Sequence, residues 1–190
     1  MKKKILLSIL VIAAIFAGFH VYQKYINYNF ETISEGKVYK SGAIPPDKLE
    51  SFIKKHNIKS VVDLRFPGTE DLVNNPEIPE ELTAEKNAIA KIKGVNYFNN
   101  GSRQVPEPHN LEYFFKIMDN PDNYPVLLHC YHGVGRAEMY AAIYRIEYEN
   151  WDVDKARTST RPITKWSAFD LNTPKGDFLH NYVPRNKKDE

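Results

Sequence analysis

The segment 126–149 constrains the fold most strongly, because a β-type pattern there passes directly into a helical one. It opens with the apolar run Val126–His129, which has the length and composition of a buried strand. Met139, Ile143 and Ile146 then recur at helical spacing. A glycine-containing turn separates the two patterns. A strand that passes through a short turn into a helix is a building unit of α/β folds.

The rest of the chain repeats this alternation. Short apolar runs predict strands and periodic apolar positions predict helices, the strands at 38–40, 60–64 and 95–98 and the helices from about 46, at 80–91 and at 111–118. The stretch 66–79, rich in Pro, Gly, Asn and acidic residues, predicts a surface loop. We therefore expect an α/β fold with a central, largely parallel sheet flanked by helices. A length of 190 residues suits one such domain, placed at 37–190.

The N-terminus predicts a separate hydrophobic helix. Three lysines at 2–4 precede the uncharged run 5–22, which at about 1.5 Å per residue is just long enough to cross a membrane. Because only Lys24 follows the run closely, the charge bias favours a cytoplasmic N-terminus and an extracytoplasmic domain. Small residues near the end of the run also fit a signal peptide, whose cleavage would secrete the protein. We assign 1–25 to a signal anchor or signal peptide and 26–36 to a connector.

Charge and cysteine content exclude several classes of function. The 26 basic and 24 acidic residues nearly cancel, and the basic ones are scattered, which argues against nucleic acid as a partner. Cys130 is the one cysteine, so an intramolecular disulfide or a thiolate-rich metal site cannot form. The sequence shows no convincing cluster of metal ligands. We therefore predict neither a metal nor a cofactor.

The turn between the strand and the helix carries the candidate chemistry. Its two glycines can adopt backbone angles closed to other residues, so successive N–H groups can converge on one anion. The helix that follows adds the positive end of its dipole, which also favours a thiolate at Cys130. Arg136 supplies a planar fork that can hold two phosphoryl oxygens. The predicted nucleophile is Cys130, and the predicted phosphate-binding residues are Tyr131, His132, Gly133, Val134, Gly135 and Arg136.

This turn resembles the signature of the cysteine-based protein phosphatases of the dual-specificity and tyrosine type, which reads His-Cys, five residues, then Arg. The match falls on His129, Cys130, Gly133 and Arg136. Val-Tyr-Lys-Ser-Gly at 38–42 and the strand ending Asp-Leu-Arg are similar to bacterial members and to the atypical fungal and plant branch, so the likeness covers roughly 37–150. It implies a tyrosine-phosphatase-like fold, a phosphocysteine intermediate, no metal, and a shallow cleft at the carboxyl ends of the parallel strands.

Two positions depart from the family pattern. Relatives carry Ser or Thr after the arginine, where the hydroxyl helps the sulfur to leave, but this chain has Ala137. Relatives also have a general-acid Asp on a loop upstream of the cysteine, whereas 99–110 contains no Asp and Glu107 is its one carboxylate. Glu107 is therefore the predicted acid, and the alternatives are Asp63, Glu70 and Asp71. We otherwise interpret Asp63 and Arg65 as a structural ion pair or as loop anchors, and His129 as a scaffold residue.

The expected activity is hydrolysis of phosphate monoesters, foremost phosphotyrosine in a phosphoprotein. The interior of the loop carries no lysine, which favours protein over inositol phosphates as substrates. The alternative from another class is a phosphate-binding module that keeps the cradle without turnover, because Ala137 and the missing Asp both weaken the catalytic cycle. A rhodanese-like sulfur carrier is a third interpretation, although its loop is typically shorter. The N-terminal helix makes the membrane a further expected partner.

Overall fold

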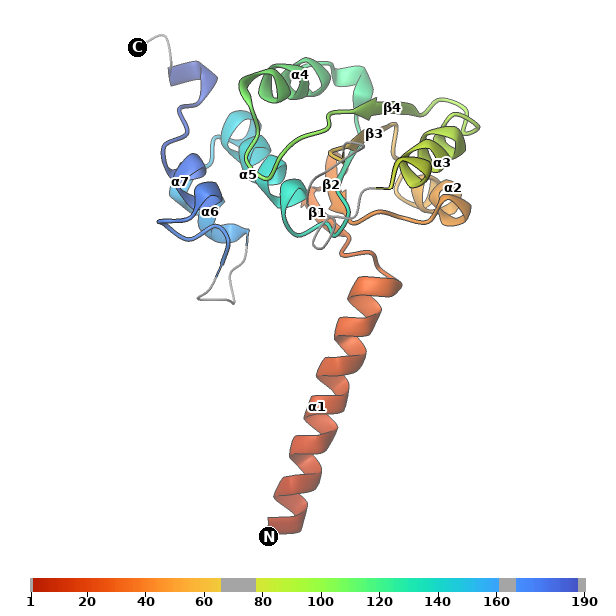
Figure 1. Cartoon of the computed structure of the whole chain (residues 1–190), viewed down its shortest axis with the longest axis vertical. Helices are drawn as coiled ribbons and strands as arrows, with labels where there is room; N and C mark the ends of the chain where they lie inside the picture. Colours follow the sequence, from red (N-terminus) through yellow and green to blue (C-terminus); the bar gives the residue numbers. More distant parts are fainter. Residues whose placement is uncertain (1, 66–77, 161–166, 188–190) are drawn as a thin grey trace.

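The computed structural model describes residues 2–65, 78–160 and 167–187, and within them it shows one five-stranded sheet in the order β1-β2-β5-β3-β4 (Figure 1). The first strand runs antiparallel to its neighbour and the other pairs are parallel. The strands are β1 (Glu31–Ser34), β2 (Val38–Ser41), β3 (Ser60–Asp63), β4 (Asn96–Asn99) and β5 (Val126–His129). The predicted α/β fold with a largely parallel sheet is confirmed.

The register of the parallel strands brings their carboxyl ends to one edge of the sheet. Ser41 on β2 and Asp63 on β3 both lie opposite His129, the last residue of β5. Asp63 in turn lies opposite Asn99 on β4. The residues that follow these strands therefore meet at the same edge, where the Cys130 loop begins.

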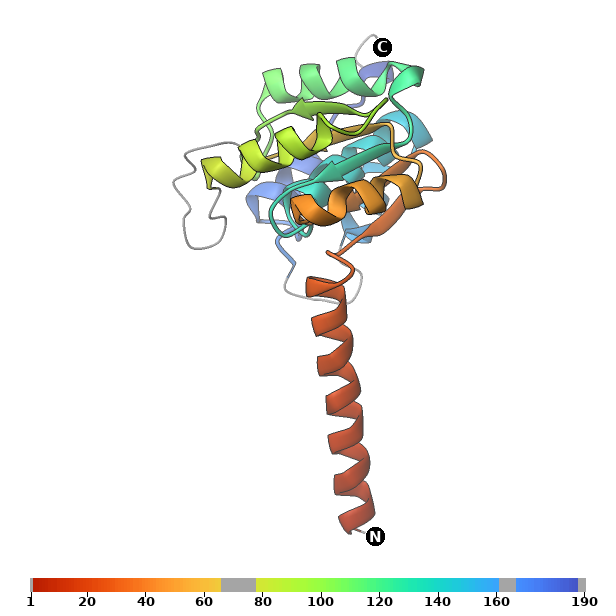
Figure 2. The same cartoon turned by 90° about the vertical axis from the view of Figure 1, so that its right-hand side faces the viewer.

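Helices cover both faces of the sheet (Figures 1 and 2). Alternate strand residues such as Val61 and Leu127 join the apolar cluster under α2 and α3, whereas Val62 and Leu128 join the cluster under α4 and α5. Two short helices, α6 and α7, pack beside α5. The helices are α2 (Pro46–Lys55), α3 (Pro79–Ile89), α4 (Pro108–Met118), α5 (Arg136–Glu149), α6 (Val153–Ser159) and α7 (Pro174–His180), with 3₁₀ turns at Pro121–Asn123 and Arg185–Lys187.

The helix α5 is the central helix of the domain, because every residue from Arg136 to Ile146 is buried. A helix enclosed on all sides carries no single apolar stripe. It begins directly at the loop after β5, with Gly135 as its N-cap residue. The position of this helix end is therefore fixed by the core and not by a surface loop.

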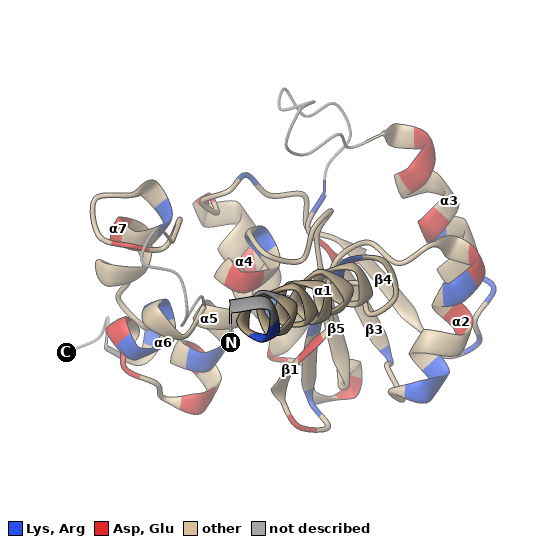
Figure 3. Cartoon of the chain, turned by 90° about the horizontal axis from the view of Figure 1, so that it is seen from below, with Lys and Arg blue, Asp and Glu red and all other residues tan. Residues whose placement is uncertain are grey.

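The helix α1 (Lys2–Tyr25) projects away from the sheet domain (Figures 1 and 2). Its stretch Leu7–Tyr25 spans 19 residues with a mean hydropathy of 1.5, and none of it is buried in the structure. Length and composition suit either a membrane-spanning helix or a signal sequence. Figure 3 looks along this helix toward the domain, where acidic and basic residues are interspersed over α2, α3, α6 and α7.

The predicted elements differ from the observed ones in two places. The segment expected as a connector contains β1, whose sequence Glu-Thr-Ile-Ser buries only Ile33 fully, so an edge strand of this kind leaves little periodic signal. The short helix α7 was not predicted, although Thr173 caps it and Pro174 opens it. The loop predicted at 66–79 lies largely outside the described residues.

Candidate active site

The Cys130 loop connects β5 to α5 and packs against the end of β2. Gly133 has a φ of 73°, in the left-handed region, and a side chain there would collide with the backbone of Ser41 and Gly42. Both observations require glycine at 133. Gly135 has a φ of −126° and a ψ of −90°, so it lies outside the left-handed region. Its constraint is the close approach of two side chains, described below.

The carbonyl groups of three consecutive loop residues, 131 to 133, are held by donors from outside the loop. The C=O and N–H groups of a trans peptide point in opposite directions, so holding each carbonyl directs the next N–H to the other side. The donors are Ala43 N–H to Tyr131 O at 3.1 Å, Asn29 Nδ2 to His132 O at 2.9 Å, and Lys40 Nζ to Gly133 O at 3.3 Å.

The sulfur of Cys130 lies on the side to which these N–H groups are directed. The N–H of Gly133 donates a hydrogen bond to Cys130 Sγ at 3.3 Å, and the cysteine is 2% exposed. A sulfur that accepts a backbone N–H beside a helix N-terminus is in a setting that stabilises a thiolate. The Gly133 N–H thus faces the thiol, as the predicted anion nest requires of each of its N–H groups.

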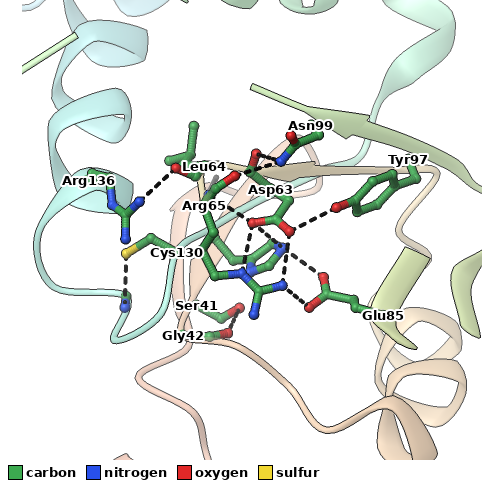
Figure 4. Close-up of polar contacts among 12 residues, drawn as sticks. Ser41, Gly42, Asp63, Leu64, Arg65, Glu85, Tyr97, Asn99, Cys130 and Arg136 are labelled. Atoms are coloured by element: carbon green, nitrogen blue, oxygen red, sulfur yellow. Dashed lines mark hydrogen bonds and ion pairs between the residues drawn. The ribbon is translucent and has the colours of Figure 1, made fainter. Parts of the chain in front are cut away.

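Arg136 is held beside this sulfur by backbone carbonyls of two other segments (Figure 4). Its Nη1 donates hydrogen bonds to Leu64 O at 2.9 Å and to Ser102 O at 3.3 Å, and the residue is 2% exposed. The first segment follows β3 and the second follows β4. Three carboxyl ends of parallel strands thus meet at one guanidinium group, which is how the fold orients the predicted phosphate clamp.

A buried ion pair lies beneath the loop. Lys40 Nζ lies 2.8 Å from Glu138 Oε1 and 3.0 Å from Glu31 Oε2. Burial by itself lowers the pKa of Lys40, but the two carboxylates outweigh it and the pKa is raised. Burial also raises the pKa of Glu138, against the opposing effect of Lys40. Lys40 therefore stays cationic while it holds the Gly133 carbonyl, a role that the sequence did not reveal.

A second, largely buried cluster surrounds Asp63 at the end of β3, and Figure 4 shows Asp63 with Arg65, Glu85 and Tyr97. Arg65 donates to both carboxylate oxygens of Asp63, each at 2.9 Å, and it also pairs with Glu85. His129 Nε2 lies 2.8 Å from Glu85 Oε1, and Tyr97 donates its hydroxyl to Asp63 at 2.9 Å. The predicted structural pair of Asp63 and Arg65 is thus present as part of a larger network.

The electrostatics of this cluster favour the charged forms of Asp63 and His129. Burial alone raises the pKa of Asp63, but His129 and Arg65 reverse the shift and the pKa is lowered. Burial alone lowers the pKa of His129, but Glu85 and Asp63 raise it above its ordinary value. A carboxylate with a lowered pKa and both oxygens occupied is a poor proton donor. Asp63 is therefore disfavoured as the alternative general acid, and the interpretation of His129 as a scaffold residue stays a prediction.

Asp63, Glu85 and His129 also offer ligand atoms within 4.8 Å of one another. The guanidinium group of Arg65 lies among these groups and pairs with both carboxylates. The guanidinium group of Arg65 thus supplies the positive charge that balances the two carboxylates. The donor set is explained by this network without a metal ion.

The predicted general acid Glu107 lies at the N-cap of α4. Its backbone N–H donates to Asn110 Oδ1 at 3.2 Å, and its carboxylate is half exposed, 3.5 Å from Arg103 Nε and 3.6 Å from His109 Nδ1. None of these contacts, drawn from the described residues, reaches the Cys130 loop. Two other predicted alternatives, Glu70 and Asp71, lie outside the described residues.

Two side chains that the sequence analysis did not single out approach the loop at Gly135. A Cβ atom built on this glycine would lie 3.0 Å from Gln104 Oε1 and 3.3 Å from Lys175 Nζ. Lys175 comes from α7, far along the chain, and adds a cation next to the predicted phosphate site. The Thr-Pro sequence that opens α7 was the available signal for this helix, but nothing local to it indicates contact with the loop.

The comparisons with known proteins agree with this architecture. The core catalytic domain of the PP-IP phosphatase SIW14 from S. cerevisiae is 22% identical over 82% of this chain and 85% of that chain, with a TM-score of 0.61. A putative phosphatase from Shewanella putrefaciens CN-32 is 22% identical over 80% and 87%, with a TM-score of 0.55. TpbA from P. aeruginosa is 18% identical over 70% and 73%, with a TM-score of 0.52. At these identities the likeness shows a shared fold.

The family assignment comes from a match of the sequence itself. Among curated proteins no sequence matches this chain. A family model described as "DSP-PTPase phosphatase fused to NAD+ kinase" matches residues 13–173, which is most of the chain and includes the whole Cys130 loop. The chain therefore belongs to this family of dual-specificity-type and tyrosine-type phosphatases.

Proposed function

We propose that this chain hydrolyses phosphate monoesters, foremost phosphotyrosine in a phosphoprotein, with Cys130 as the nucleophile and Arg136 as the phosphate clamp. The observation that carries the proposal is the hydrogen bond from Gly133 N–H to Cys130 Sγ beside a guanidinium group anchored at Leu64 O. A thiolate, an anion nest and a two-pronged cation in one buried turn suit transfer of a phosphoryl group to sulfur.

The reaction has two halves. In the first, the thiolate of Cys130 attacks phosphorus, a P–S bond forms, and the P–O bond to the substrate alcohol breaks while Arg136 and the loop N–H groups hold the phosphoryl oxygens. Glu107 is our proposed donor of the proton that the leaving oxygen takes up. In the second, water attacks phosphorus, the P–S bond breaks, and sulfur leaves as a thiolate. This cycle needs neither a metal nor another cofactor.

The surroundings of the loop support an aromatic phosphate as the substrate. A cavity of about 820 Å³ lies beside the first residues of the loop, and its wall combines apolar or aromatic residues such as Tyr28, Ile44 and Tyr131 with charged residues of both signs, namely Lys24, Lys48, Arg65, Glu80, Glu81 and Glu85. Such a wall suits an aromatic ring better than a polyanionic inositol ring. Among the similar folds, TpbA has been solved in complex with pTyr, and SIW14 is described as a PP-IP phosphatase.

The same cavity relates the proposed site to the N-terminal helix. Lys24 and Tyr25, in the last turn of α1, line it together with residues of the Cys130 loop. We propose that α1 is an uncleaved signal anchor that holds the domain at the membrane, on the extracytoplasmic side. The alternative is a signal peptide whose removal releases a secreted enzyme. Residues 26–36, which include β1, join this helix to the rest of the sheet domain.

The test is an assay on a phosphotyrosyl peptide, a generic aryl phosphate and an inositol pyrophosphate, with wild type and Cys130→Ser side by side. We expect hydrolysis of the aryl phosphates by wild type alone, with the same rate after treatment with EDTA. Preference for the inositol pyrophosphate would support the proposed mechanism but contradict phosphotyrosine as the main substrate. Loss of activity with EDTA and its recovery with a divalent ion would contradict the proposed mechanism.

The second candidate function is a phosphate-binding module without turnover, favoured by the fully buried Ala137 that follows the arginine. It predicts that wild type binds phosphotyrosyl peptide, hydrolyses none of the three substrates, and loses binding in Arg136→Ala. Hydrolysis that depends on Cys130 excludes it.

A further inference from the structure

The segment that follows the N-terminal helix reaches the Cys130 loop directly. Asn29, four residues beyond the end of α1, donates from Nδ2 to His132 O at 2.9 Å, across 103 residues of sequence. Its neighbour Tyr28 accepts at its carbonyl the N–H of Gly42, the residue on which the loop packs. This short segment is therefore part of the scaffold of the loop, although it was expected to be a plain connector.

The hydrogen bond from Asn29 acts on one particular peptide group. The peptide between His132 and Gly133 has its carbonyl held by Asn29 on the outer side and its N–H bonded to Cys130 Sγ on the inner side. Because this peptide is planar and trans, the two groups point in opposite directions, and fixing one fixes the other. Asn29 is thus connected to the sulfur through two hydrogen bonds and one peptide group.

The backbone conformation suits asparagine at this position. Asn29 has a φ of 50° and follows Tyr28 with a φ of 53°, so both residues lie in the left-handed region. Asparagine tolerates this region better than most residues, and its short amide can still reach a neighbouring carbonyl. The turn after α1 is therefore shaped so that the amide of Asn29 faces the loop.

From this geometry we propose that Asn29 is a positioning residue, which holds the His132–Gly133 peptide so that its N–H stabilises the Cys130 thiolate and a bound phosphoryl group. The inference rests on the proposed role of the loop as the phosphate site. It ties the chemistry of the loop to the segment that joins it to the N-terminal helix, so that the enzyme needs residues upstream of the predicted domain boundary at 37.

The test uses the full chain in detergent and the alkylation of its single cysteine by iodoacetamide, with inorganic phosphate as the protecting ligand. In Asn29→Gly the amide is lost while the backbone angle remains accessible. Losing a hydrogen bond to a charged group changes the ionisation equilibrium by about tenfold or more, and Asn29 only holds the peptide that makes this bond. We therefore expect alkylation near pH 6 to slow by about three- to tenfold. Well above the ordinary pKa of a cysteine thiol, at about pH 9.5, the rates of the two proteins should agree within about twofold.

The matched control is Asn57→Gly, because Asn57 is exposed and has a φ of 52° but lies at the end of α2. The substitution at 29 leaves every charged side chain around the loop in place, namely Glu31, Lys40, Asp63, Glu85, His129, Arg136, Glu138 and Lys175. Protection by phosphate should weaken by a similar factor in Asn29→Gly and stay unchanged in Asn57→Gly.

Equal alkylation rates near pH 6 in Asn29→Gly and wild type would overturn the proposal. If Asn29→Gly fails to fold, Asn29→Asp keeps the shape without the N–H donors, and Asn27→Asp controls for the added charge, since Asn27 donates to Gln23 and Phe30 instead. If Asn29→Gly is alkylated more slowly than wild type but wild type hydrolyses no phosphoester, the positioning role stands and the proposed enzymatic activity does not. If an Asn29 variant is active and is alkylated as fast as wild type, the proposed enzymatic activity stands and the positioning role does not.

Discussion

Lys40 and Glu138 form an ion pair at 2.8 Å in which both side chains are almost fully buried, beneath the carbonyl of Gly133. The pair joins the end of β2 to the first turn of α5, so it fixes the two elements between which the Cys130 loop is held. Charges in such a place are costly unless they are paired. The pair is therefore a point at which the stability of the fold and the geometry of the loop depend on the same atoms.

The first prediction concerns the removal of this cation. Lys40→Met leaves Glu138 buried without its partner, which costs about 3 to 5 kcal/mol in the free energy of unfolding near neutral pH. Chemical denaturation measures it, and the activity on an aryl phosphate should fall as well because the Gly133 carbonyl loses its donor. The control is Lys54→Met, which removes an exposed pair with Glu50 at 2.6 Å, so its effect should stay within about 1 kcal/mol. Similar losses in both variants would contradict the role given to the buried pair.

The second prediction concerns the acid stability of the cluster around Asp63. The pKa of Asp63 is lower in the folded chain than its ordinary value, mainly through His129 and Arg65 acting against burial. A group of this kind stabilises the fold above its unfolded pKa of about 3.9, and the contribution is lost as the pH falls through the folded pKa. The free energy of unfolding should therefore decline below about pH 4.5, and less steeply in Asp63→Asn than in the exposed control Asp122→Asn. If the free energy of unfolding declines with the same slope in both variants, Asp63 does not contribute to the loss of stability in acid.

The region from β5 to α5 was predictable because its signals are local. The apolar run, the glycines and the arginine lie within one continuous segment, and both element bounds match the expected ones. The partners of this region were not predictable in the same way. Asn29 and His132 are 103 residues apart, and Lys40 and Gly133 are 93 apart. Such contacts depend on how the strands are ordered in the sheet, which no local pattern specifies.

The upstream carboxylate shows the opposite difficulty. Glu107 was selected because it is the one acid in its segment, but the local sequence Glu-Pro-His-Asn also opens a helix, and the structure uses Glu107 for that purpose. Composition identifies which residue types are present on a loop. It does not tell whether a side chain points toward the site or caps a helix at the surface.

The third prediction tests the clamp. Arg136→Lys keeps the charge but replaces a planar fork with a point charge, and it also removes the geometry that reaches Leu64 O and Ser102 O. We expect kcat/KM on an aryl phosphate to fall by at least about 100-fold, or about 2.7 kcal/mol of transition-state stabilisation. The control is Arg103→Lys, an exposed arginine on the neighbouring loop. Catalytic efficiency close to wild type in Arg136→Lys would remove the residue from its proposed role.

The fourth prediction concerns the proposed general acid. If Glu107 protonates the leaving group, Glu107→Gln should flatten the alkaline limb of the pH profile and slow substrates with poor leaving groups most. An activated aryl phosphate should be nearly unaffected, because its leaving group needs no proton. The carboxylate also sits at a helix N-terminus, so thermal denaturation of the variant separates a change in stability from a change in chemistry. An unchanged pH profile would direct attention to Glu70 and Asp71.

The last prediction turns on Ala137, which separates this chain from the family pattern. In the first half-reaction the thiolate attacks and the alcohol leaves, and a hydroxyl at 137 plays no part. In the second half sulfur must depart as a thiolate, and one hydrogen bond to a charged group is worth about 1.5 to 3 kcal/mol, or about 10- to 150-fold in rate. Hydrolysis of the phosphocysteine should therefore limit the wild-type enzyme. Rapid mixing with an aryl phosphate should show a burst of product followed by slow turnover.

The variant Ala137→Ser should speed the steady state and reduce the amplitude of this burst. Serine adds one oxygen to a position that is 0% exposed, whereas the branched side chain of threonine is harder to place in so tight a core. The matched control is Ala141→Ser, which lies one turn further along the same buried helix and is also 0% exposed. If Ala137→Ser turns over no faster than Ala141→Ser and wild type shows no burst, departure of the sulfur is not the slow step, and the family's hydroxyl has been replaced in this chain by some other donor to Cys130.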